Sequence, residues 1–238
     1  MTTAALDRPS DVARRGFDTA PPLFIAGWSD VVMIHYRVPP ERLQPLVPFP
    51  LETFDGAAWV SLVAFTLRDL RFARGGPSLT THGFLNVRTY VPGNGIYFLA
   101  EWLPNPLCVF LGPRLYGLPY RRGRLDYRHS PDRLVGRVED RAGALAYEGR
   151  PVTRQRSLCV TPRDLFLMER YVAFTRRGRT DRLFRVWHDP WRQSPAELDV
   201  LDDSLVASTG EWFAHAERVS SCYSPGFDEV WMGRPERI

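Results

Sequence analysis

Three hydrogen-bonding side chains, Asn86, Arg88 and Tyr90, occur two residues apart in a segment that is otherwise apolar enough to be buried. In a β-strand this spacing places them on one face, with Val87 and Val91 on the opposite face. If the polar face points inward, the Arg88 guanidinium needs an anionic partner or ligand, because an unpaired buried charge is very costly. If it points outward, the same residues form only a solvated face. The spacing fits both the wall of a polar cavity and an exposed strand.

Other side chains could take part in the same chemistry. Glu101 and Arg114 lie in neighbouring segments, and each fits either a substrate site or a structural ion pair. The five histidines stand singly and the three cysteines lack metal-ligand spacing, so the sequence predicts no metal site. The chain also contains no Gly-rich phosphate loop and no Gly-x-Ser-x-Gly elbow. We therefore expect neither a metal nor a cofactor.

The chain contains no lysine, since all 31 basic residues are arginines. A lysine amine can be desolvated until it is neutral and can then attack a carbonyl, whereas a guanidinium stays protonated. This difference excludes Schiff-base decarboxylation, class I aldol chemistry, pyridoxal phosphate attachment and a P-loop lysine. The exclusion holds whatever fold the chain adopts.

The arginines form two clusters, and neither is typical of a nucleic-acid surface. The clusters are Arg121, Arg122, Arg124 and Arg128, and Arg176, Arg177, Arg179 and Arg182. Few aromatic residues alternate with them, so the stacking platform that binds single strands is missing. The formal net charge is only +4, and no apolar run is long enough for a signal peptide or a membrane span. We expect a cytoplasmic protein that contacts neither nucleic acid nor membrane.

A mainly β fold must position the candidate residues, because segments rich in β-branched and aromatic residues dominate the chain. Residues 1–22 are expected to form a flexible tail, and residues 23–238 a single domain, since no repeat or linker divides them. The expected strands cover residues 24–38, 57–67, 86–92, 95–102, 123–128, 134–139, 145–148, 153–158, 171–175, 183–187 and 217–232. The expected helices cover residues 39–47, 105–117 and 161–170, whose starts carry proline or capping residues.

A series of short motifs extends from about residue 24 to the end of the chain. They are Thr53-Phe54-Asp55-Gly56, Ala58-Trp59-Val60, Leu85-Asn86-Val87-Arg88-Thr89-Tyr90-Val91, Tyr116-Gly117-Leu118-Pro119-Tyr120, Glu169-Arg170-Tyr171, His188-Asp189-Pro190-Trp191 and Tyr223-Ser224-Pro225-Gly226. Together they resemble the bacterial YqjF-like proteins of unknown function, which belong to the acetoacetate-decarboxylase-like superfamily. The resemblance implies a mainly β (α+β) fold, with a β-cone or barrel-like sheet, a few peripheral helices and a small-molecule cavity inside.

The resemblance also implies a departure from decarboxylase chemistry. In acetoacetate decarboxylases a Pro-Lys-Lys motif supplies the Schiff-base lysine and the neighbour that lowers its pKa. Those two positions fall on Tyr120 and Arg121 of this chain, and a carboxylate near the reacting centre falls at or near Asn86. A phenol cannot form an imine, and an amide cannot exchange a proton near neutral pH. The resemblance therefore implies the decarboxylase cavity without Schiff-base decarboxylation.

Two functions fit these residues. The first is a cofactor-independent enzyme of the lyase, isomerase or cyclase type that acts on a small carboxylate- or carbonyl-containing metabolite. Its substrate-binding candidates are Asn86, Arg88, Arg114 and Arg121, and its catalytic candidates are His35, Tyr90, Glu101 and Tyr120. Arginine would clamp an anionic group, a tyrosine would donate to a developing enolate oxygen, and His35 or Glu101 would move the proton.

The alternative function is a non-catalytic ligand-binding or sensor protein that uses the same cavity. The absence of lysine and of the proton-shuttling carboxylate favours this alternative. It predicts saturable binding without turnover, whereas the enzyme predicts a product from the same ligand. Relatives in the superfamily often assemble, so a homo-oligomer is compatible with the resemblance, although no sequence feature fixes a stoichiometry.

Overall fold

Strand pairing closes part of the sheet into a ring. The computed structural model describes residues 8–159 and 161–238. In ring order the strands are β1 (Phe24–Val38), β2 (Ala58–Phe72), β3 (Thr80–Val91), β4 (Gly95–Leu103), β10 (Val172–Arg177), β11 (Thr180–Trp187) and β13 (Glu217–Met232). The ring closes because β13 pairs with β1 on one side and with β11 on the other. The mainly β, barrel-like fold expected from the sequence is confirmed.

A second layer covers the outside of the ring. Its strands continue from β13 in the order β12 (Arg192–Asp202), β8 (Gly143–Pro151), β7 (Leu134–Asp140) and β6 (Arg124–His129). Tyr127 on β6 donates a hydrogen bond of 3.1 Å to the Phe84 carbonyl oxygen of β3, which ties this layer back to the ring. Three short strands extend the edges: β5 (Tyr120–Arg122) pairs with β4, β9 (Ser157–Leu158) with β12, and β14 (Glu236–Arg237) with β11.

Alternation along the ring strands produces two separate hydrophobic cores. One core lies inside the ring and includes Met33 and Tyr90. The other fills the space between the ring and the outer layer and includes Val87. Strand β3 is therefore buried on both faces, and the face that carries Asn86, Arg88 and Tyr90 points into the ring rather than into solvent.

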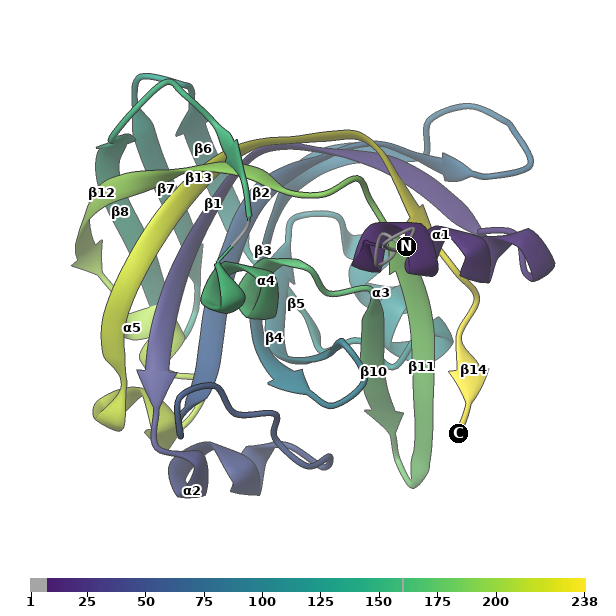
Figure 1. Cartoon of the computed structure of the whole chain (residues 1–238), viewed down its shortest axis with the longest axis horizontal. Coiled ribbons are helices and arrows are strands. Elements are labelled where there is room, and N and C mark those ends of the chain that lie inside the picture. The colour runs from purple at the N-terminus through teal and green to yellow at the C-terminus, as the bar shows by residue number, and fades with distance from the viewer. Residues whose placement is uncertain (1–7, 160) are drawn as a thin grey trace, which may run out of the picture.

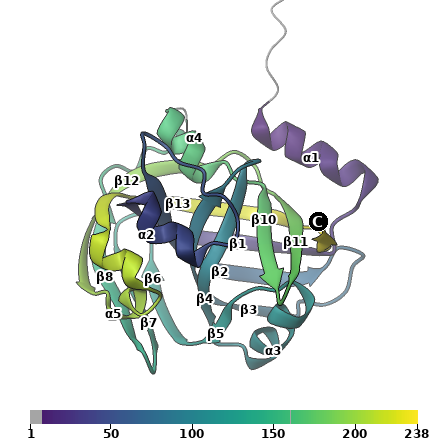
Figure 2. The same cartoon turned by 90° about the horizontal axis from the view of Figure 1, so that it is seen from below.

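Short helices lie around this framework. They are α1 (Pro9–Thr19), α2 (Pro40–Leu43), α3 (Pro106–Leu115), α4 (Pro162–Met168), α5 (Ser204–Ala207) and the 3-10 turns η1 (Gln44–Leu46) and η2 (Glu211–His215). In Figure 1 α4 lies in front of the ring, and Figure 2 shows α4 and α3 at opposite ends of the molecule. The Asn105 side chain caps α3 and the Thr161 side chain caps α4, as their positions predict. Within the described ranges no helix is long and apolar enough to cross a membrane.

Two expectations about the elements are wrong. The expected flexible tail contains α1 over part of its length: Phe17 is buried, and the Trp187 indole donates a hydrogen bond of 3.1 Å to the Ser10 carbonyl oxygen. Residues 1–7 of that tail lie outside the described residues. The strand expected over residues 153–158 is reduced to β9, and the longer β12, which pairs with β13, is not among the expected strands. The sequence pattern does not predict β12, because many of its positions are polar and exposed and because Pro195 is unusual within a strand.

Candidate functional site

Strand register brings three polar residues side by side on the inner face of the ring. His35 on β1 lies opposite Ser61 on β2, and Ser61 lies opposite Arg88 on β3. Tyr90 follows Arg88 on the same face of β3. All four side chains are buried, and the most exposed of them, Arg88, retains only 5% of its surface. These residues come from three strands, so only the pairing of β1, β2 and β3 places them together.

A continuous hydrogen-bond chain fixes the tautomer of His35. Tyr90 donates its hydroxyl proton to the Leu167 carbonyl oxygen at 3.1 Å, because a carbonyl can only accept. Ser61 must then donate to the Tyr90 oxygen at 2.5 Å, and His35 Nδ1 must donate to the Ser61 oxygen at 2.7 Å. The proton of the neutral imidazole therefore lies on Nδ1, and Nε2 carries the free lone pair. The Nε2 atom faces Cys222 Sγ at 3.8 Å.

Burial keeps His35 neutral. Desolvation, followed by the positive charges of Arg88 and Arg163, lowers the pKa of His35 to about 3. A second buried histidine, His188, stacks on Phe227 with ring centroids 4.7 Å apart, and burial lowers its pKa to about 4. Both imidazoles are thus uncharged bases at neutral pH.

The depressed pKa of His35 predicts acid sensitivity. Because the folded-state pKa lies below the ordinary value of 6.5, the stability that His35 contributes is complete above pH 6.5 and is lost as the pH falls toward 3. His35→Gln should reduce the acid-induced loss of unfolding free energy by about 1.4 kcal/mol per pH unit. Urea unfolding of both proteins at pH 7, 6, 5 and 4 measures the difference. The exposed control His215→Gln should keep the wild-type slope, and a wild-type slope for His35→Gln would contradict the prediction.

Arg88 is a buried cation without a protein counter-ion. Its Nη2 donates a hydrogen bond of 3.0 Å to the Leu167 carbonyl oxygen, and its Nε has no partner. In the described part of the chain no carboxylate lies within ion-pair distance of it. The nearby Arg170 differs, since its Nη1 lies 2.5 Å from the Glu52 carboxylate. A buried guanidinium with a free donor is the arrangement expected for an anion site.

A second row of polar residues lies next to the first. Asn86 on β3 is opposite Glu101 on β4, and Glu101 is in register with Tyr120 on β5. The Oδ1 of Asn86 and the Oε2 of Glu101 are buried without a hydrogen-bond partner. Burial raises the pKa of Glu101 well above its usual value, and burial beside Glu101 does the same to the pKa of Tyr120. Burial therefore favours the protonated form of both groups.

Two of the predicted binding residues lie apart from these rows. Arg114 is exposed on α3, where its guanidinium covers the Phe110 ring at 3.6 Å. Arg121 is 5.3 Å from the Trp102 ring centroid, on the opposite face of β5 from Tyr120. Arg121 lines a surface hollow of about 900 Å³ that reaches Tyr120. The structure thus groups His35, Asn86, Arg88, Tyr90 and Glu101 in the interior. Tyr120 is half-buried where the hollow reaches it, and Arg114 and Arg121 lie outside.

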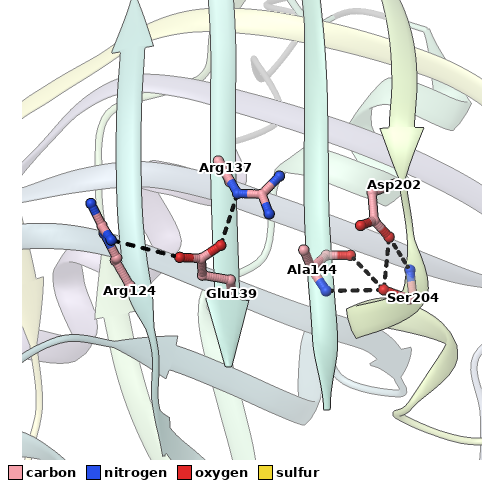
Figure 3. Close-up of polar contacts among 6 residues, drawn as sticks. All are labelled: Arg124, Arg137, Glu139, Ala144, Asp202 and Ser204. Atoms are coloured by element: carbon pink, nitrogen blue, oxygen red, sulfur yellow. Dashed lines mark hydrogen bonds and ion pairs between the residues drawn. The ribbon is translucent and has the colours of Figure 1, made fainter. Parts of the chain in front are cut away.

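A second surface hollow, of about 500 Å³, lies between β7, β8 and the start of α5. Figure 3 shows that its polar groups bind one another. Arg137 Nε donates to Glu139 at 2.8 Å. The Ser204 hydroxyl donates to Asp202 at 2.7 Å and accepts from the Ala144 amide at 3.0 Å. These contacts pair the side chains of the hollow with one another and with the backbone of the outer layer.

Comparison with known proteins identifies the family. Residues 26–228 match the model of DUF2071, whose members are described as uncharacterized conserved proteins. The chain belongs to this family. The uncharacterized protein YqjF of Bacillus subtilis (strain 168) is 28% identical over 193 residues, which cover 77% of this chain and 80% of that protein. The YqjF-like resemblance of the sequence motifs is confirmed.

The fold of this DUF2071 protein is similar to those of solved acetoacetate decarboxylase-like structures. An acetoacetate decarboxylase-like enzyme from Sphingomonas wittichii RW1 superposes with a TM-score of 0.63 at 16% identity, over 91% of this chain and 93% of the other. The enduracididine biosynthesis enzyme MppR, complexed with the condensation product of pyruvate and imidazole 4-carboxaldehyde, gives 0.61 at 16% identity, over 92% and 89%. Because the sequence identities are low, the comparison establishes the fold alone, which is acetoacetate-decarboxylase-like.

Sequence reasoning misses the residues that complete the His35 chain. It assigns no role to Ser61, to Cys222 or to the Leu167 carbonyl. Ser61 gives a weak signal, because it is the polar member of an apolar strand face that also holds Trp59 and Val63. The Leu167 carbonyl gives none, since a backbone group carries no sequence information.

Proposed function

We propose that the interior of the ring binds a small molecule that carries a carboxylate beside a carbonyl group. We further propose that the protein acts on it as a cofactor-independent enzyme of the lyase, isomerase or cyclase type. The observation that carries the proposal is the buried Arg88 guanidinium with a free donor and no protein counter-ion. A ligand carboxylate supplies the missing partner, because it accepts two hydrogen bonds from a guanidinium.

In this proposal His35 is the general base. Its Nε2 carries the lone pair, and the chain through Ser61 and Tyr90 fixes the ring orientation. Arg88 contributes to the low pKa of His35, so an anionic ligand on Arg88 would raise that pKa and strengthen the base. His35 would then remove a proton next to the ligand carbonyl as an enolate forms.

The protonated pair of Glu101 and Tyr120 suits the developing enolate oxygen. Burial raises the pKa values of both groups and so favours their protonated forms. Each can donate a hydrogen bond to an oxyanion, which is worth more in a dry interior than in water. Asn86, between this pair and Arg88, offers a further hydrogen-bonding group. The hollow that reaches Tyr120 is the approach that we assign to the ligand, with Arg121 attracting its negative charge.

The structural neighbours support the same class of ligand. One is an acetoacetate decarboxylase-like enzyme, and another holds a condensation product of pyruvate. The Schiff-base chemistry that the resemblance to acetoacetate decarboxylases implies cannot be transferred, because this chain has no lysine. What we transfer to this chain is the binding of a small carbonyl compound.

A non-catalytic binder or sensor is the second candidate. The specific observation in its favour is the burial of His35, which lowers the pKa of its imidazole to about 3. A base this weak removes protons slowly near neutral pH. The same anion site would then serve for recognition alone. The two candidates share Arg88 and differ in whether the bound molecule is changed.

The test is a thermal-shift screen of keto acids, hydroxy acids and aromatic carboxylates, followed by mass spectrometry of the hits. A ligand at 100 times its Kd should stabilise the protein by about 2.7 kcal/mol. The enzyme predicts product from that ligand, and His35→Gln should lower kcat about a hundredfold or more while changing the Kd little. Saturable binding without product from any hit supports the binder. No stabilisation by any carboxylate would contradict both.

A further inference from the structure

A thiol lies against the free lone pair of His35. Cys222 on β13 is in register with Met33 on β1, two residues from His35. Its Sγ is 3.8 Å from His35 Nε2, which is a hydrogen-bond contact for sulfur. The side chain is buried in the core inside the ring. The proposed function assigns no role to this thiol.

The direction of the hydrogen-bond chain makes His35 an acceptor toward Cys222. Because Nδ1 donates to Ser61, the Cys222 thiol must donate to Nε2. A nucleophile, a base and a third group that orients the base form the arrangement used in covalent catalysis. Here the members are Cys222, His35 and Ser61, and Tyr90 anchors the far end on the Leu167 carbonyl.

Burial is the largest influence on this thiol and raises the pKa of Cys222 to about 12. Asp164 also raises this pKa, whereas Arg88 and a backbone hydrogen bond with Met33 lower it. His35 stays neutral. The resting state is therefore a neutral thiol beside a neutral imidazole, not a thiolate–imidazolium pair. Proton transfer to His35 must accompany bond formation, so the reactivity of the thiol depends on His35.

We propose that Cys222 is a nucleophile that adds reversibly to the carbonyl carbon of a ligand whose carboxylate is held by Arg88. The Sγ–C bond forms as the π bond of the carbonyl breaks, and the thiol proton passes to His35 Nε2. The same proton then moves to the former carbonyl oxygen, which gives a neutral hemithioketal. The step needs no oxidant and releases no group. This inference takes the anion site at Arg88 from the proposed function. The reactivity of the thiol itself does not depend on that function.

Alkylation with a matched pair of probes tests the reactivity. Iodoacetamide is neutral and iodoacetate is anionic. With either probe the sulfur displaces iodide, and the thiol proton is released. Cys159 is an internal control, since it is buried to the same degree in the same core and the described hydrogen bonds give it no histidine partner. Peptide mass spectrometry over time should show Cys222 reacting with iodoacetamide at least tenfold faster than Cys159. His35→Gln should remove that advantage, and equal rates at the two thiols in the wild type would overturn Cys222 as a nucleophile.

The anionic probe separates this inference from the proposed function. Iodoacetate should modify Cys222 at least tenfold faster than iodoacetamide does, because Arg88 binds its carboxylate, and Arg88→Met should abolish the difference. If iodoacetate has no advantage while Cys222 still reacts faster than Cys159, the anion site fails and the nucleophile stands.

A pair of ligands tests addition to a carbonyl directly. Pyruvate has a ketone where lactate has a hydroxyl, so only pyruvate can be captured by the thiol. Cys222→Ala should weaken pyruvate binding at least tenfold in a thermal-shift titration and leave lactate binding unchanged. Equal losses for both ligands, or no loss for either, would overturn the covalent step.

Discussion

Methionine in place of Arg88 is expected to stabilise the unliganded protein and to remove its affinity for carboxylate ligands. The guanidinium is buried, makes one described hydrogen bond, and lacks a counter-ion. A methionine of similar length fills the same space without a desolvated charge, so we expect a gain of about 1–3 kcal/mol in unfolding free energy. The Leu167 carbonyl keeps Tyr90 as a donor. Denaturant unfolding with and without a keto acid measures both effects, and the ligand-induced stabilisation should disappear.

Arg170→Met is a matched control, for which we expect the opposite change in unfolding free energy. Arg170 is equally buried and close to the same Tyr90 ring, but its Nη1 is paired with Glu52 at 2.5 Å and its Nε donates to Phe166. Arg170→Met should therefore destabilise the protein by about 3 kcal/mol, because it breaks a buried pair and leaves Glu52 without its partner. If Arg88→Met destabilises the protein to the same extent, then Arg88 is a structural residue and the anion site is wrong.

The polar face of β3 is the part of the site that the sequence predicts best. Alternation separates Asn86, Arg88 and Tyr90 from Val87, and this depends only on the two-residue period of a strand. Whether that face points inward depends on the outer layer, because β6, β7, β8 and β12 bury the opposite face. A strand covered on both sides cannot be distinguished by its own pattern from one with a solvated polar face.

Register is the information that a single sequence lacks. His35, Ser61 and Arg88 meet because β1, β2 and β3 pair with particular offsets, which include bulges in β1 and β2. A shift of one residue in any pair would turn a side chain to the other face. Cys222 reaches His35 only because β13 closes the ring beside β1. Long-range pairing of this kind leaves no local signal, so the partner of His35 could not be named in advance.

Glutamine in place of Glu101 should make the protein's stability less sensitive to rising pH. Burial raises the pKa of Glu101 in the folded state, so the folded protein holds this proton more tightly than the unfolded chain does. The stability that Glu101 contributes is complete below its ordinary pKa near 4.5 and is lost as the pH rises toward the raised value. Over that window wild-type unfolding free energy should fall by about 1.4 kcal/mol per pH unit relative to Glu101→Gln.

The difference between the two unfolding curves isolates this carboxyl from every other titrating group. Chemical denaturation at each pH from 5 to 9 should show the advantage of Glu101→Gln growing with pH until it reaches a plateau, which marks the folded-state pKa. The exposed control Glu197→Gln should run parallel to the wild type throughout. Because Glu101 faces Asn86 across β3 and β4, a plateau above pH 7 means that a neutral carboxylic acid lies in the ring at physiological pH. Parallel curves for Glu101→Gln and the wild type would remove this proton donor from the proposed mechanism and leave Tyr120 and the Asn86 amide as the groups of this row that can donate to an enolate.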